Sequence, residues 1–206
     1  MIDAITYEDM LKHILENELI EDTVGILFTR PDLCTGKDIL ESLNYYHHLT
    51  GGKINFYLPG YGAYWNGSDY PDRNTVTCID GVDWLFSCKA FVDFVNDLED
   101  VSKWEYSGES ELLLISYHDK ILDFSKTIVF YLDEMLRDET ISSVSSFVTE
   151  LNRRVKRNNS IMSISTFGAS RRVSKEIVEE IIESMPKFIS NPLCKGKHYL
   201  HRDFSL

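Results

Sequence analysis

The chain is 206 residues long, 43% of them hydrophobic and 26% charged, and its formal net charge is −12. These values are typical of a globular protein with one well-buried core and exclude a disordered chain. The negative charge argues against general nucleic-acid binding, which depends on neutralising phosphates. No apolar run approaches the roughly 18 residues of a membrane span, and the polar, acidic first ten residues predict no secretory signal.

The charge is unevenly distributed. Residues 1–150 hold 10 Lys and Arg against 28 Asp and Glu, whereas residues 151–206 hold 11 against 5. Two interpretations stay open. Either the two regions pack together and partly neutralise each other, or the basic C-terminal part contains a phosphate or anion site.

The first elements are predicted from hydrophobic periodicity and from turn residues. Apolar residues at helical spacing predict a helix over 7–20. The run TVGILF predicts a strand over 23–28, which Pro31 ends. A helix is predicted over 35–49, ended by a glycine pair, and KINFYL predicts a strand over 53–58. Strand, helix and strand with short connections are typical of a parallel β-α-β unit.

The stretch LPGYGAYW, residues 58–65, opens a long segment without clear periodicity that runs over 59–86. Glycine frees the backbone and aromatic side chains favour burial, so the stretch is either a packed corner or a ligand-facing wall. Irregular segments of this length are usually functional or mobile. Ser87 is predicted to cap a helix that runs to about Val101.

The remaining sequence continues the alternation of strands and helices. It predicts strands over 111–117, 126–132 and 161–165, a short hairpin arm at 121–124, and helices over 143–156 and 174–185. With no polar linker between these elements, we expect a single α/β domain over residues 1–206. Its fold class is a mainly parallel sheet flanked by helices on both faces, a Rossmann-like layout whose strand order stays open.

In an open parallel sheet, ligands bind outside the carboxyl ends of the strands. If the strands are parallel, these ends carry cationic, aromatic and acidic side chains. The predicted ligand-binding residues are Arg30, Gly60, Tyr61, Gly62, Tyr64, Trp65, His118, Arg171 and Arg172. Aromatic faces stack on a planar base, guanidinium groups bind phosphate and carboxylates hold ribose, so the mixture suits a nucleotide-like ligand. A polar surface without a ligand has the same composition, and that alternative stays open.

The two arginines lie just before a predicted helix N-terminus, where the helix dipole favours anions. Such a pair is tolerable when acidic residues neutralise it and useful when an anionic ligand does. The preceding Gly168 and Ala169 are small enough to let a phosphate approach the backbone. We therefore expect Arg171 or Arg172 to contact an anion.

The candidate catalytic residues are three carboxylates: Asp133, Glu134 and Glu109. Asp133 and Glu134 follow the end of a predicted strand. Glu109 and Glu111 lie at the amino end of theirs, so we expect both to be remote from the carboxyl-edge site unless the loop before them folds back. A Glu held close to the aromatic residues of WEYSGESELLLI would have a raised pKa and act as an acid or a base.

Metal and cofactor sites are not predicted. The cysteines, which are Cys34, Cys78, Cys88 and Cys194, are scattered without a C-x-x-C pair. This pattern predicts free thiols in a reducing cytoplasm and no zinc site. The segment CTGKDI lacks the leading glycine and the Ser or Thr of a phosphate-binding loop.

Two functions follow from these features. The first is a nucleotide- or nucleoside-directed enzyme that acts at an N-glycosidic bond. The second is a non-enzymatic module that binds a partner protein or senses a small ligand, with the aromatic loop as its anchor. An enzyme needs a carboxylate or histidine beside the aromatic wall in a concave pocket, whereas a binding module presents the wall on a convex surface.

Overall fold

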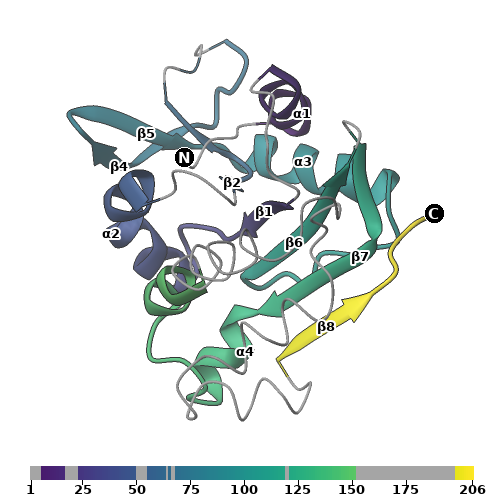
Figure 1. Ribbon diagram of the computed structural model, residues 1–206. Coiled ribbons are helices and arrows are strands. Elements are labelled where there is room, and N and C mark those ends of the chain that lie inside the picture. The colour runs from purple at the N-terminus through teal and green to yellow at the C-terminus, as the bar shows by residue number, and fades with distance from the viewer. Residues whose placement is uncertain are drawn as a thin grey trace, which may run out of the picture.

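The computed structural model describes residues 6–16, 23–49, 55–63, 65, 68–118, 121–151 and 198–206. Its helices are α1 (Tyr7–Glu16), α2 (Cys34–Leu49), α3 (Cys88–Asp100) and α4 (Leu132–Arg137), shown in Figure 1. Residues 144–151 are also helical. The strand predicted over 161–165 and the helix predicted over 174–185 lie outside the described residues.

Five strands form the larger sheet, sheet A. They are β1 (Thr23–Phe28), β2 (Asn55–Tyr57), β6 (Glu111–His118), β7 (Ile121–Tyr131) and β8 (Tyr199–Arg202), in the order β2-β1-β6-β7-β8. Strands β1 and β2 run parallel, as the β-α-β pattern predicts. The other three neighbouring pairs are antiparallel. The prediction of a mainly parallel, Rossmann-like sheet is therefore wrong.

The short connection between β6 and β7 explains the error. Two residues separate these strands, and so short a connection joins antiparallel strands only. The hairpin arm and the strand that were predicted separately at 121–124 and 126–132 are one strand, β7. Strand β6 is buried on both of its faces. Its sequence is therefore a nearly continuous apolar run, which is the pattern typical of strands in parallel sheets.

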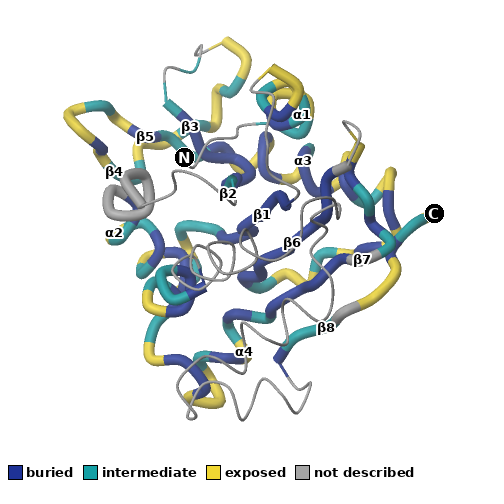
Figure 2. Tube along the Cα trace, in the orientation of Figure 1, coloured by how far each residue is buried: buried dark blue, intermediate teal, exposed yellow. Residues whose placement is uncertain are grey.

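Sheet A is the middle of three layers, and its inner strands β1 and β6 are buried (Figure 2). Helices α1 and α3 cover one face, where Phe94 packs edge-on against Phe28 at a centroid distance of 5.8 Å. Helix α2 and residues 144–151 cover the other face, where Phe147 packs against Phe130 at 5.2 Å. The apolar side chains of each strand thus alternate between two separate cores.

A smaller sheet, sheet B, consists of β3 (Tyr61–Gly62), β4 (Asn74–Ile79) and β5 (Val82–Phe86) in the order β3-β5-β4. Its neighbouring strands are antiparallel. Asp80 and Gly81 join β4 to β5 with φ angles of 50° and 81°. An Asp-Gly pair of this kind forms two-residue hairpin turns. The segment 59–86, which we expected to be irregular, therefore contains a hairpin whose turn signal is present in the sequence.

Two carboxylates join neighbouring segments by capping helices or supporting their caps. Asp38 on α2 accepts hydrogen bonds from the backbone N–H groups of Val144 and Ser145, at 2.8 and 3.2 Å, where the helical residues begin. Ser87 caps α3, as predicted, by accepting from the N–H of Ala90. Asp72 accepts from the Ser87 hydroxyl at 2.8 Å, which ties the segment before β4 to α3. These caps satisfy N–H groups that the helices leave unpaired.

Candidate functional site

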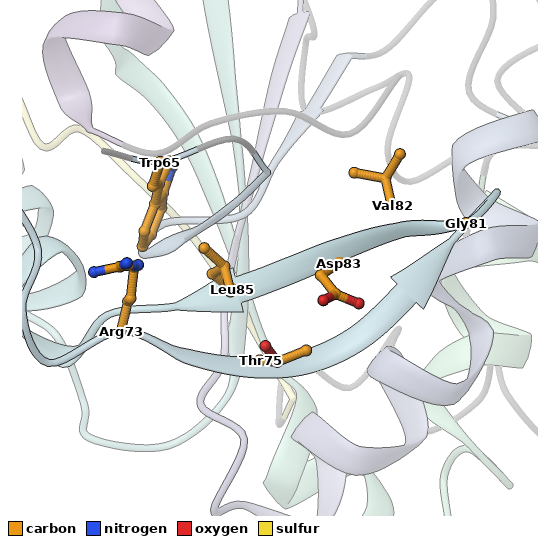
Figure 3. A pocket seen from close by; sticks show the side chains of 7 residues that line it. All are labelled: Trp65, Arg73, Thr75, Gly81, Val82, Asp83 and Leu85. Carbon is orange, nitrogen blue, oxygen red and sulfur yellow. The ribbon is translucent and has the colours of Figure 1, made fainter. Parts of the chain in front are cut away.

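An open groove of about 840 Å³ lies over sheet B (Figure 3). Its lining combines an aromatic ring, a guanidinium group, a carboxylate and apolar side chains. These residues are Trp65, Arg73, Thr75, Gly81, Val82, Asp83 and Leu85. Figure 3 shows Trp65, Arg73 and Leu85 gathered at one end, with Val82 and Gly81 at the other.

The alternation along β5 accounts for Asp83 and Leu85 in this lining. Trp84 is only 6% exposed and packs in the core, whereas its neighbours Asp83 and Leu85 line the groove. Thr75 on β4 pairs with Leu85, so both residues lie on the groove face. One face of the hairpin therefore belongs to the core and the other is open to a ligand.

Trp65 and Arg73 are held by the segment between β3 and β4. The Trp65 ring packs against the Tyr70 ring at a centroid distance of 5.0 Å. Its indole Nε1 is buried and has no hydrogen-bond partner among the described residues. Arg73 donates to the carbonyl oxygen of Tyr70 at 3.3 Å. The adjoining Asp72 accepts from the N–H of Lys89 at 3.0 Å, and this hydrogen bond lowers the pKa of Asp72.

A second group of polar residues gathers at the carboxyl end of β1. The strand register pairs Phe28 with Glu111 and Glu111 with Tyr131, so the ends of β1, β6 and β7 meet at one edge. The expectation that Glu109 and Glu111 are remote from Arg30 is therefore wrong. It assumed parallel strands, and the antiparallel direction of β6 brings its amino end to this edge.

Glu111 is buried at this edge and is 1% exposed. Its carboxylate accepts from the N–H and the hydroxyl of Ser107, both at 2.9 Å, and from the Trp104 indole at 3.3 Å. Burial raises the pKa of Glu111, and these hydrogen bonds oppose the rise. The Glu with a raised pKa beside aromatic rings is thus Glu111. Three donors from the surrounding chain bind its carboxylate, so these contacts hold the segment 104–111 in place.

The three predicted catalytic carboxylates each have a partner or an exposed position. Asp133 accepts from the N–H of Ser110 at 2.6 Å. Glu109 accepts two hydrogen bonds from Arg137, at 2.8 and 3.0 Å, and Glu134 is exposed in the first turn of α4. Asp133 and Glu134 lie on α4 and Glu109 precedes β6, and neither α4 nor β6 lines the groove (Figure 1). Their catalytic roles stay predictions.

The corner at 60–62 is packed. Gly60 has a φ of 79°, and a Cβ there would lie 2.7 Å from the Cβ of Phe91. Tyr61 is fully buried and donates to the carbonyl oxygen of Thr29 at 3.4 Å, and Gly62 is buried as well. Of the aromatic residues in LPGYGAYW, Tyr61 supports the core and Trp65 faces the groove.

The other predicted ligand-binding residues are placed elsewhere. His118 ends β6 and pairs with Ile121, at the end of the strand opposite to Glu111. Tyr64, Arg171 and Arg172 lie outside the described residues. Sequence reasoning missed Arg73 and Asp83, although the Asp-Gly turn would have placed Asp83 on a hairpin strand.

Comparison with known proteins finds no matching family model, no matching curated protein and no matching solved structure. Among the described residues, no helix is long and apolar enough to cross a membrane. The same part of the chain contains no group of three or more His, Cys, Asp or Glu side chains that could hold a metal ion.

Proposed function

We propose that this chain binds a nucleotide- or nucleoside-like ligand in the groove over sheet B. The observation that carries the proposal is that Trp65, Arg73 and Asp83 line one concave surface. A ligand with a planar ring, hydroxyl groups and a phosphate matches these three side chains. A carboxylate and an aromatic ring that line the same concave surface also favour a ligand site over a convex interaction surface.

Each side chain has a distinct role in this proposal. Trp65 stacks on the base, an interaction worth about 1–3 kcal/mol for aromatic side chains and bases. Arg73 binds the phosphate through its charged N–H donors, and Asp83 accepts hydrogen bonds from the ribose hydroxyls. Because Asp83 is exposed, a ligand can reach its carboxylate without any change in core packing.

Cleavage of the N-glycosidic bond is a second, finer proposal, and Asp83 favours it. A carboxylate beside the sugar stabilises the positive charge that develops on the ring as the base leaves. Water then adds to the sugar, and the base leaves with a proton. None of the predicted residues Asp133, Glu134 and Glu109 lines the groove, so Asp83 is the carboxylate to test first.

Calorimetry with AMP, adenosine and ribose 5-phosphate tests the proposal. We expect W65A to weaken AMP and adenosine binding about tenfold or more and to affect ribose 5-phosphate less, because only the first two contain a base. R73Q should weaken AMP more than adenosine. R137Q is the matched control, because Arg137 pairs with Glu109 away from the groove. Equal affinities in wild type, W65A and R73Q would contradict the proposal.

The finer reaction is tested by chromatography of the reaction mixture. Wild-type protein should release free base from the bound compound, and D83N should bind it but release less. Binding without release in the wild type would leave the chain as a sensor of small ligands. If none of the three compounds binds, the groove is better explained as a surface for a partner protein.

We also propose that the protein works in the cytoplasm. Cys34, Cys78 and Cys88 are exposed and unpaired, and exposed free thiols are typical of a reducing compartment. Labelling of these thiols in freshly lysed cells, without added reductant, should be complete.

A further inference from the structure

Two buried polar atoms at the carboxyl end of β1 have no hydrogen-bond partner among the described residues. They are the Nε of Arg30 and the hydroxyl oxygen of Tyr106. A buried donor without an acceptor is unfavourable, and native proteins keep few of them. Both groups are donors, so each would be satisfied by an oxygen atom with lone pairs.

The two residues are held in place by their surroundings. The carbonyl oxygen of Arg30 accepts from the N–H of Leu33 at 3.1 Å. It also lies against Gly36, where a Cβ would come within 1.9 Å of it, so this backbone is fixed against α2. The Tyr106 ring packs against Phe28 and Phe91 at centroid distances of 5.8 and 5.5 Å. The backbone of Arg30 and the ring of Tyr106 are therefore held in place before any ligand binds.

The charges around the two donors define the ligand further. The Arg30 guanidinium also contacts the exposed Asp32 carboxylate, with an Nη2 to Oδ2 distance of 3.3 Å. Burial raises the pKa of Tyr106 to about 12, and the nearby Arg30 opposes the rise while Glu111 and Asp133 add to it. Tyr106 thus stays a neutral donor at physiological pH. One cation among several carboxylates suits a singly charged anion better than a doubly charged one.

We propose that Arg30 and Tyr106 form a second binding site, which takes a singly charged oxyanion such as a carboxylate or a phosphodiester. The oxyanion displaces the Asp32 carboxylate from Arg30. It then accepts three hydrogen bonds, from Nε and Nη2 of Arg30 and from the Tyr106 hydroxyl. Arg30 is the residue type that binds oxyanions in this forked manner. The site goes beyond the proposed nucleotide groove, because it uses no residue that lines the groove.

The experiment titrates the 206-residue chain with acetate, dimethyl phosphate and inorganic phosphate, and binding is followed by NMR chemical shifts and by thermal unfolding. Wild-type protein should bind acetate or dimethyl phosphate, and the stronger of the two identifies the source of the oxyanion. R30Q and Y106F should each weaken binding about tenfold, as expected for the loss of a hydrogen bond to a charged group. Y7F, which changes a half-buried tyrosine on α1, should leave binding unchanged.

Thermal unfolding without ligand separates this role from a structural one. Since the Tyr106 hydroxyl has no partner to lose, Y106F should unfold at the same temperature as the wild type or higher. A lower unfolding temperature for Y106F would show that the hydroxyl serves the fold and would overturn the proposal. So would unchanged affinity in Y106F, tighter binding of the phosphate dianion, or no binding of any probe at 100-fold molar excess over about 1 mM protein. W65A should bind these probes normally, so the two sites can fail independently.

Discussion

Sheet A and sheet B differ in how much of their surface the fold uses. Both faces of sheet A are covered by helices, and all six residues of β1 are buried. Sheet B gives one face to the core through Ile79 and Trp84, and on β4 the other positions are exposed or half-buried. Side chains on the open face of sheet B are free to vary without loss of the core. The candidate groove lies on this open face, where core packing does not restrict the choice of side chain.

The largest difference should appear when a leucine is truncated in each sheet. Leu114 on β6 is 1% exposed, so L114A should lower the free energy of unfolding by about 2–5 kcal/mol. Leu85 on β5 is partly exposed and lines the groove, so L85A should cost roughly 1 kcal/mol or less. Urea denaturation of both variants measures this. Similar losses would mean that sheet B is as much a part of the core as sheet A.

Two glycines with nearly the same backbone conformation allow the packing at two positions to be compared directly. Gly60 and Gly81 have φ angles of 79° and 81°. A Cβ on Gly60 would collide with Phe91, whereas a Cβ on Gly81 would meet nothing within 4 Å. We expect G81A to cost about 1–2 kcal/mol of stability from strain alone, and G60A to cost about 1–3 kcal/mol more from overpacking. Equal losses, measured by denaturation, would contradict the packed corner around Gly60.

The smallest expected effects are changes in how the free energy of unfolding depends on pH. Burial raises the pKa of Glu111, so the folded state holds its proton more tightly than the unfolded state does. This contribution to stability is fully present below the unfolded pKa and is lost as the pH rises through the folded pKa. E111Q should flatten the dependence of the free energy of unfolding on pH in this window. Parallel curves for the wild type and E111Q would show that Glu111 ionises as freely in the fold as outside it.

Asp72, beside sheet B, should show the opposite sign. Its pKa is lowered, chiefly by the hydrogen bond from the Lys89 N–H. The stability that this cap contributes is present above the unfolded pKa and is lost as the pH falls through the folded pKa. D72N should therefore reduce the loss of stability on acidification. A steeper acid transition in D72N, followed by circular dichroism, would contradict the cap.

Local signals in the sequence predicted the parts of the fold that depend on local chemistry. The pattern over 23–58 predicted the parallel pair β1 and β2 with α2 between them, and Ser87 predicted the start of α3. Strand direction was not predictable from apolar runs, because strands buried on both faces look alike in either direction. That error also misplaced Glu109 and Glu111.

The candidate groove was predicted only in part. Trp65 was recognised because a tryptophan in a glycine-rich loop is unusual, but Tyr61 in the same loop is buried. Arg73 and Asp83 have ordinary sequence surroundings, and the place of Asp83 on the groove face depends on the Asp80-Gly81 turn. A hairpin turn fixes the strand register and therefore which side chains share a face. A prediction of this turn would have placed Asp83, Leu85 and Thr75 on the same face of the hairpin.

The most direct test of the nucleotide groove observes the three tryptophans of the chain, which are Trp65, Trp84 and Trp104. Trp84 and Trp104 are 6% and 2% exposed, whereas Trp65 lines the groove. Titration of ¹⁵N-labelled protein with AMP should shift the indole N–H signal of Trp65, because the adenine ring stacks on it, and leave the other two indole signals in place. An unmoved Trp65 signal at saturating AMP, or a larger shift at Trp104, would contradict a ligand site over sheet B.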